Sequence, residues 1–272
     1  MKTFVIGDIH GRRAQLNLLL EMLPREPNTD TLVFLGDLID RGVDAPGVVS
    51  DVIALEREAP AHVHCLRGNH EQMLLDFLDE GATIWLKPII GGERTFEQYT
   101  GEQLLITKEE DYEAARQQLK EIIPAEHLDF IRRTPFYYED DYALYVHAGL
   151  DHGKHPSETD SQQLLWTRSK DFYLHYRGKP CLFGHTPTAF LPYRGRVGRH
   201  GIYIFHSAIG LDSGYNHNSP LSCLQLPDFV LYQSYANGHT TRHHITAFIP
   251  EELRAMQDKS KKEKGKSAGE PL

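Results

Sequence analysis

This 272-residue chain has nine side chains of types that bind metal ions and phosphate, and they occur in clusters directly after short apolar runs. They are Asp8, His10, Asp37, Asp40, Arg41, Asn69, His70, His147 and His185. Carboxylate and amide oxygens mixed with imidazoles suit Mn²⁺, Fe or Zn²⁺, and no cysteine is placed for a closed structural zinc site. Two ions about 3.5–4 Å apart need a shared ligand, which a carboxylate can supply and an imidazole cannot. We expect Asp37, the central acid of the set, to be that bridge.

The elements that must position these residues follow a repeated pattern in the first seventy residues. Apolar runs at 3–6, 31–35 and 63–66 end in Gly-Asp or Gly-Asn turns, and each is followed by helical spacing. The first helix is expected over 13–23. The second is expected to begin after the N-cap Asp44, with Pro46 in its first turn, and the third is expected to end at Gly81. This repetition predicts βαβ units in a mostly parallel sheet, whose carboxyl edge gathers Asp8, Asp37 and Asn69.

The rest of the chain predicts three further parts. Residues 82–140 are charged and helical in pattern, which predicts an inserted helical cap. Close proline and glycine punctuation suggests a second, more antiparallel sheet built from strands at 143–146, 181–183, 202–205, 221–226 and 229–235. We therefore expect an α/β fold of two packed mixed β-sheets flanked by helices over 1–250. The lysine-rich residues 251–272 are interpreted as a disordered basic tail.

Charge and cysteine content limit the partners and the compartment. The net charge is −9, and residues 259–272 carry +3, which leaves −12 on residues 1–258. Such an acidic body is a poor nucleic-acid surface. No apolar stretch reaches about 18 residues, so no transmembrane helix or membrane role is expected. Three cysteines in apolar runs argue against a disulfide framework and favour a reducing compartment, the cytoplasm.

Five short blocks in a fixed order are far more specific than any single residue. They are GDIHG (7–11), GDLIDRG (36–42), GNHE (68–71), HAG (147–149) and GHTP (184–187). With further blocks at 85–99, 164–172 and 211–214, the sequence resembles the phosphoprotein-phosphatase branch of the calcineurin-like metallophosphoesterases. The resemblance covers residues 3 to about 226 and implies a four-layer metallophosphoesterase sandwich. One departure is Ala148, where many members have glycine, and this residue is small enough for the same turn.

The resemblance also implies a metal site and its ligands. One divalent ion would be held by Asp8, His10 and Asp37. The other would be held by Asp37, Asn69, His147 and His185. Manganese is the expected metal, with iron and zinc as alternatives, and a water that bridges the two ions would attack phosphorus directly, without a phosphoenzyme.

Four further residues receive roles from the same resemblance. His70, oriented by Asp40 through its other ring nitrogen, would protonate the leaving group. Arg41 would bind two phosphate oxygens in a fork, a geometry that lysine cannot offer. Arg168 would be a second phosphate clamp.

Two enzymatic functions and one binding function are considered. The leading interpretation is a phosphomonoesterase for phosphoserine and phosphothreonine in proteins, with phosphotyrosine as a further candidate, similar to compact bacterial and phage enzymes without regulatory subunits. The alternative is a symmetrical dinucleoside tetraphosphatase with the same metal site. Asp40-Arg41-Gly42 and Glu71 follow the protein-phosphatase form. A binding scaffold would be expected to have lost ligands or the acid His70, and this chain keeps them all.

The charges of the predicted cap bear on the choice between the two enzymes. Its basic residues are interleaved with acids, and only Arg132 and Arg133 are concentrated. A polyphosphate chain would need further basic groups along the groove, so the pattern favours a phosphomonoester in a phosphoprotein or phosphopeptide.

Overall fold

The computed structural model of the protein describes residues 1–151, 153–197, 200–214, 218–251 and 253–254. Its helices are α1 (Arg13–Met22), α2 (Ala45–Glu58), α3 (Asn69–Glu80), α4 (Gly92–Thr100), α5 (Glu109–Ile122), α6 (Ala125–Arg133), α7 (Ser161–Trp166) and α8 (Lys170–His175). Its strands are β1 (Thr3–Ile6), β2 (Thr31–Phe34), β3 (Val63–Cys65), β4 (Tyr137–Glu139), β5 (Leu144–Val146), β6 (Cys181–Phe183), β7 (Tyr203–Phe205), β8 (Ala208–Gly210), β9 (Leu221–Leu226), β10 (Val230–Ser234) and β11 (Thr240–His244). Of the predicted tail, residues 252 and 255–272 lie outside the described residues, whereas Leu253 is buried.

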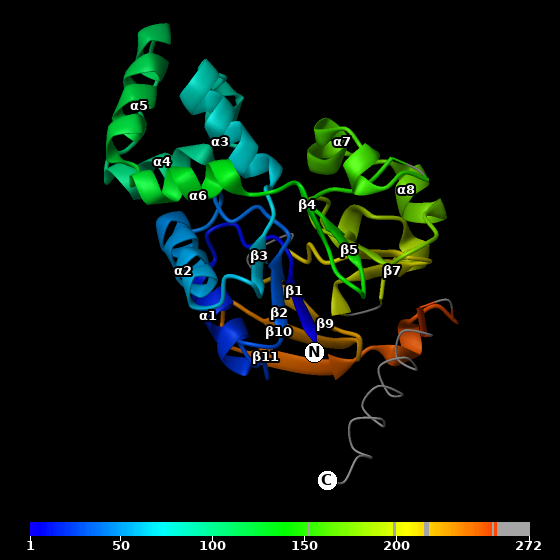
Figure 1. The fold of residues 1–272 in the computed structure, drawn as a ribbon. Helices are drawn as coiled ribbons and strands as arrows, with labels where there is room; N and C mark the ends of the chain where they lie inside the picture. Colours follow the sequence, from blue (N-terminus) through cyan, green and yellow to red (C-terminus); the bar gives the residue numbers. More distant parts are fainter. Residues whose placement is uncertain (152, 198–199, 215–217, 252, 255–272) are drawn as a thin grey trace.

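Two mixed sheets form the centre of the fold. The first has the order β11-β10-β9-β1-β2-β3, in which β1, β2 and β3 are parallel. The second has the order β4-β5-β6-β8-β7, in which β5, β6 and β8 are parallel. Helices α1 and α2 lie beside the first sheet, and α7 and α8 lie beside the second (Figure 1). The predicted α/β fold of two packed mixed sheets flanked by helices is therefore confirmed.

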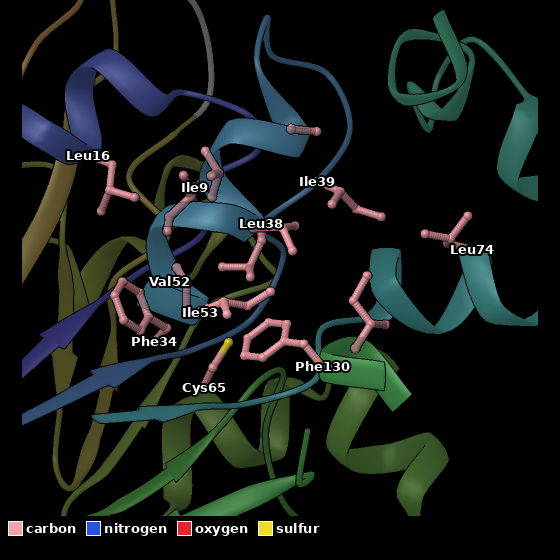
Figure 2. Close-up of a cluster of buried hydrophobic side chains, with 14 of the residues drawn as sticks. Ile9, Leu16, Phe34, Leu38, Ile39, Val52, Ile53, Cys65, Leu74 and Phe130 are labelled. Atoms are coloured by element: carbon pink, nitrogen blue, oxygen red, sulfur yellow. The ribbon is translucent and has the colours of Figure 1, made fainter. Parts of the chain in front are cut away.

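Alternation along the strands explains why the sheets pack in layers. Phe4 and Ile6 of β1 belong to the core between the first sheet and its helices, part of which Figure 2 shows. Val5, between them, belongs to the core that joins the two sheets, together with Leu182 of β6. Successive side chains of a strand point to opposite faces, so a continuous apolar run is needed where both faces are covered. The short apolar runs of this sequence meet that need.

The predicted helix ends rest on local chemistry that the structure contains. Asp44 caps α2, because its Oδ1 accepts a hydrogen bond from the backbone N–H of Gly47 at 2.9 Å, and Pro46 stands in the first turn. α3 ends at Gly81, whose φ of 77° is a left-handed conformation that glycine adopts without strain.

The prediction that residues 221–226 and 229–235 belong to the second sheet is wrong. β9 pairs antiparallel with β1 and β10 pairs antiparallel with β9, so both extend the first sheet. The second sheet is also less antiparallel than expected, because only β4 and β7 run against their neighbours. Pattern and punctuation identify a strand, but its pairing partner depends on contacts more than 200 residues away.

The segment predicted as a helical cap contains the turn η1 (Thr83–Leu86) and helices α4, α5 and α6. Its last residues form β4, which pairs with β5 and so belongs to the second sheet. Trp85 and Phe96 are buried in the first core. None of the described helices is long and apolar enough to cross a membrane. Cys65, Cys181 and Cys223 are all buried and free.

Candidate metal and phosphate site

The six predicted metal ligands follow the carboxyl ends of five parallel strands drawn from both sheets. Asp8 and His10 follow β1, Asp37 follows β2, Asn69 follows β3, His147 follows β5 and His185 follows β6. All six are buried. Short contacts connect them across the sheets: the backbone N–H of His185 donates a hydrogen bond to Asp8 Oδ2 at 2.9 Å, and Asn69 Oδ1 lies 2.9 Å from His147 Nε2. The fold thus brings together residues up to 177 positions apart.

Asp37 lies at the centre of this set. Its Oδ2 is 3.6 Å from His10 Nε2, and its Oδ1 is 3.4 Å from His147 Nε2. Two groups have donor atoms that all lie within 4.8 Å of one another, and they are His10 with Asp37 and His70, and Asp37 with His147 and His185. Asp37 is common to both groups, as a bridging ligand must be. Its role as the bridge stays a prediction.

The first of these groups contains His70 where the family resemblance has Asp8. Asp8 turns Oδ2 toward the backbone of His185, and its Oδ1 is buried without a hydrogen-bond partner among the described residues. Nε2 of His185 is likewise buried without a hydrogen-bond partner among the described residues. A buried acceptor with no partner is costly, and a cation beside each of these two atoms would satisfy it.

The imidazoles of His10 and His147 are oriented as ligands need to be. Nδ1 of His10 lies 2.9 Å from the carbonyl oxygen of Ile39, and Nδ1 of His147 lies 2.8 Å from that of Leu35. Because a carbonyl only accepts, each Nδ1 carries the hydrogen and each Nε2 keeps a lone pair directed into the site. Nε2 of His147 therefore faces Asn69 Oδ1 and the Asp37 carboxylate. This convergence of electron-pair donors fits a divalent cation.

Two motif glycines are required by the close approach of the acids. A Cβ at Gly68 would collide with Asp37 Oδ1, and a Cβ at Gly184 would collide with Asp8 Oδ1. Any other residue at either position would displace a carboxylate. The glycines of the GNHE and GHTP blocks thus leave the space that the carboxylates occupy.

Backbone strain is concentrated at the site. Seven non-glycine residues in the described part of the chain have positive φ, and five of them are His10, Asp37, Asp40, Arg41 and His185. Such conformations cost about 1–3 kcal/mol each and persist where the surroundings impose them. Glu71 imposes part of this geometry, because its carboxylate accepts hydrogen bonds from the backbone N–H groups of Asp37 and Leu38 at 2.9 and 2.8 Å.

The pKa of His70 is shifted in the opposite direction from those of the other three histidines of the site. Burial lowers the pKa of His10, His147 and His185, so these imidazoles stay neutral, as metal ligands must be. Burial also acts to lower the pKa of His70, but the charge of Asp37 and the hydrogen bond that His70 donates to Asp40 outweigh it and raise that pKa. His70 is therefore the histidine of the site that is best suited to carry a proton.

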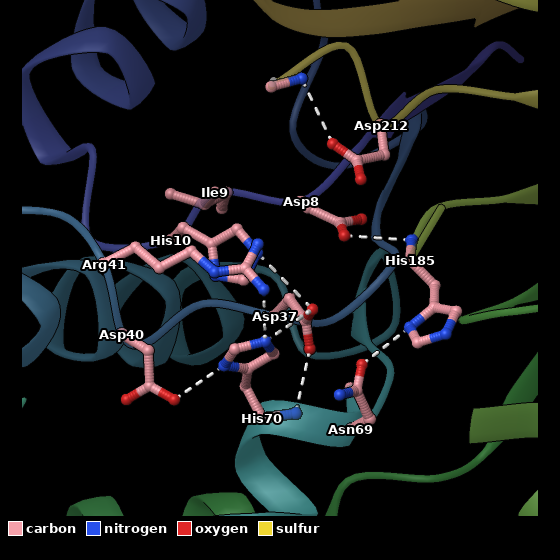
Figure 3. A network of polar contacts seen from close by, with 12 residues as sticks. Asp8, Ile9, His10, Asp37, Asp40, Arg41, Asn69, His70, His185 and Asp212 are labelled. Carbon is pink, nitrogen blue, oxygen red and sulfur yellow. Dashed lines mark hydrogen bonds and ion pairs between the residues drawn. The ribbon is translucent and has the colours of Figure 1, made fainter. Parts of the chain in front are cut away.

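His70 and Asp40 form a close pair (Figure 3). His70 Nδ1 lies 2.6 Å from Asp40 Oδ2, so the carboxylate fixes the ring and its tautomer. Arg41 lies on the other side of the ring, where its guanidinium donates to Nε2 of His70 at 3.0 Å and to Nε2 of His10 at 2.9 Å. Arg168 is exposed, and its Nη1 is 3.4 Å from Thr186 Oγ1, next to the GHTP residue His185.

Two residues without a role predicted from the sequence hold Asp40. Thr95 Oγ1 donates to Asp40 Oδ1 at 2.7 Å, and Trp85 Nε1 donates to Asp40 Oδ2 at 3.0 Å. Both belong to the 85–99 block, and that block was the sequence feature that could have pointed to them. Asp212 of the 211–214 block was also missed. It is buried near Asp8, and burial raises its pKa to about 6.

The charges of the concentrated pair Arg132 and Arg133 are both matched by acids in the structure. Arg132 donates to both carboxylate oxygens of Asp79 at 2.6 Å, and Arg133 forms an ion pair with Glu56. Both charges are matched by acids that are distant in sequence, which a local count of charges could not reveal.

Comparison with known proteins identifies relatives of this chain independently of the geometry of its site. A family model described as calcineurin-like phosphoesterase matches residues 1–196. The chain is 32% identical over 197 residues to serine/threonine-protein phosphatase 1 of Salmonella typhimurium, covering 68% of this chain and 78% of the relative. It is 31% identical over 152 residues to a symmetrical bis(5'-nucleosyl)-tetraphosphatase of Chromohalobacter salexigens, covering 55% of this chain and 45% of the relative.

One solved structure supports the same fold. A crystal structure provisionally assigned as a diadenosine tetraphosphatase matches with a TM-score of 0.58 at 21% identity, covering 89% of this chain and 92% of the other. At this identity, the likeness concerns the fold.

Proposed function

The chain belongs to the calcineurin-like phosphoesterase family and is a metal-dependent phosphatase, and from this premise we propose that it hydrolyses phosphoserine and phosphothreonine in proteins. Phosphotyrosine is a further proposed substrate. The proposed cofactor is a pair of divalent ions, manganese before iron or zinc. We also propose a cytoplasmic location, because the three cysteines are free and buried.

The observation that carries the proposal is the pair formed by His70 and Asp40. The alkoxide of serine or threonine is a poor leaving group and must be protonated as it departs. A phosphoanhydride releases a stabilised phosphate anion, which needs a proton far less. A buried histidine with a raised pKa, fixed at 2.6 Å by a carboxylate, therefore favours monoesters of alcohols.

The donor set fits two divalent cations, with Asp8, His10 and Asp37 proposed for one and Asp37, Asn69, His147 and His185 for the other. When bound, such ions supply hydroxide near neutral pH and offset phosphate charge. Arg41 would turn from the two Nε2 atoms toward the phosphate oxygens. His70 Nε2, released from Arg41, would take a proton from solvent water and then donate it to the leaving oxygen, which returns the ring to its neutral form, while Asp40 stabilises the imidazolium between the two steps. Arg168, beside His185, is proposed to bind a further phosphate oxygen.

The second candidate is a symmetrical dinucleoside tetraphosphatase, which the Chromohalobacter relative favours. The two can be separated by measuring manganese-supported kcat/KM for a panel of phosphoserine and phosphothreonine peptides and for diadenosine tetraphosphate. We expect the peptides to give the higher values, and His70→Asn to reduce peptide turnover more than tetraphosphate turnover. A reversed order of kcat/KM would transfer the proposal to the tetraphosphatase.

A further inference from the structure

A cavity of about 600 Å³ opens beside His10, a proposed metal ligand, and Arg41, the proposed phosphate-binding arginine. Its apolar walls include Ala14, Val43 and Ala236. Val43, two positions after the proposed phosphate-binding Arg41, is 80% exposed. Because His10 and Arg41 line the cavity, it adjoins the place where the phosphate would lie, and it offers apolar surface to whatever is attached to that phosphate.

The arginines that line this cavity differ in how their charge is matched. Arg13 is paired with Asp51 at 2.7 Å and with Asp44 at 3.1 Å. Arg94 is exposed and forms no ion pair with any described residue. Its Nη1 donates to the backbone oxygen of Arg41 at 3.0 Å, which places it directly beside the phosphate clamp. Arg94 thus brings to the edge of the cavity a cation that no ion pair with a described residue holds, although burial raises the pKa of the neighbouring Glu93 carboxyl and the charge of Arg94 acts to lower it.

We propose that Arg94 and this cavity form a subsite for an acidic side chain within two residues of the phosphorylated residue in a peptide substrate. The proposal rests on the proposed function. Two residues of extended chain span about 7 Å, so a phosphate at Arg41 leaves a neighbouring side chain within reach of Arg94. A guanidinium binds a carboxylate through two parallel hydrogen bonds, and the apolar walls accept the methylene groups. The cavity would thereby select acidic phosphorylation sites.

The test compares two phosphoserine peptides that differ only by Glu or Gln within two residues of the phosphoserine. For the wild-type protein with Mn²⁺, we expect kcat/KM to be about fivefold higher for the Glu peptide, as an exposed ion pair would give. Arg94→Gln should bring this ratio close to one. Arg57→Gln, which removes an exposed arginine that pairs with Glu126, should keep the ratio. Thermal unfolding of each variant checks that the fold is intact.

Two results would overturn the subsite while leaving the proposed function in place: a wild-type ratio near one, or a ratio that survives Arg94→Gln. If Arg94→Gln instead lowers turnover of diadenosine tetraphosphate and leaves the peptide ratio unchanged, the occupant is a second phosphate and the peptide subsite is wrong. Absence of turnover with either peptide would overturn the proposed function together with the subsite.

Discussion

Thr95 and Asp40 exchange two hydrogen bonds across 55 residues of sequence: the hydroxyl of Thr95 donates to Asp40 Oδ1 at 2.7 Å, and the backbone N–H of Asp40 donates to the same hydroxyl oxygen at 3.0 Å. Both residues are buried. Asp40 in turn fixes His70, so helix α4 of the inserted segment holds the residue that orients the proposed acid. The inserted segment therefore fixes the position of Asp40, and through it His70, in addition to any contact with substrate.

Replacing Thr95 with valine should remove this support while preserving shape. Losing a buried hydrogen bond of this kind costs about 1–2 kcal/mol, so we expect kcat on a phosphoserine peptide to fall about tenfold. The loss should be smaller on an aryl phosphate, whose leaving group needs no proton. Thr100→Val, at the end of the same helix, removes the hydroxyl of a half-buried residue that bonds to the backbone of Phe96 and Glu102, away from Asp40, and should leave both rates unchanged. Equal losses on the two substrates would contradict a role through His70.

The acid itself should show a larger effect of the same kind. General acid catalysis contributes about 10²–10⁴-fold, so His70→Asn should lose about that much in kcat on phosphoserine and much less on an aryl phosphate. His239→Asn, at an exposed turn, is the matched control. Adding Thr95→Val to His70→Asn should cause little further loss in kcat, because both act through one proton transfer. Equal losses of His70→Asn on both substrates would instead assign His70 to metal positioning.

The sequence predicted those parts of the fold that depend on local pattern. The strands at 3–6, 181–183 and 221–226 begin and end where their apolar runs do, and the ligands follow their strands because each turn is encoded beside its run. It could not predict that β9 pairs with β1, that Thr95 reaches Asp40, or that Arg132 meets Asp79. Each of these contacts depends on the packing of segments that are distant in sequence, which no local spacing contains.

Asp37 should be the most sensitive of the proposed ligands, because one side chain serves both groups of donors. Asp37→Asn keeps the shape but removes the charge that a bridge between two cations needs. We expect it to abolish manganese-dependent turnover and to lower the bound manganese measured after dialysis. Asp79→Asn, which affects only an exposed ion pair with Arg132, is the control. Near-normal activity of Asp37→Asn with Mn²⁺ would show that the two-metal assignment is wrong.

The carboxylate of Glu71 should contribute to the free energy of unfolding through the backbone hydrogen bonds that it accepts. Its Oε2 accepts from the backbone N–H groups of Asp37 and Gly68, each at 2.9 Å, while its Oε1 accepts from that of Leu38. Glu71→Gln keeps one oxygen but sets an amide NH₂ against backbone donors, so at least one buried N–H loses its acceptor. That should cost about 1–3 kcal/mol in the free energy of unfolding, measured by urea denaturation.

The matched control for this change is Glu80→Gln on the same helix, where the side chain is exposed and the free energy of unfolding should hardly change. Because the three N–H groups belong to the turns that carry Asp37 and Asn69, the Glu71→Gln protein should also bind Mn²⁺ more weakly, even under conditions where it is fully folded. A variant as stable as the wild type would mean that water or backbone rearrangement can replace the carboxylate, and that the strained φ of 53° at Asp37 is imposed by other contacts.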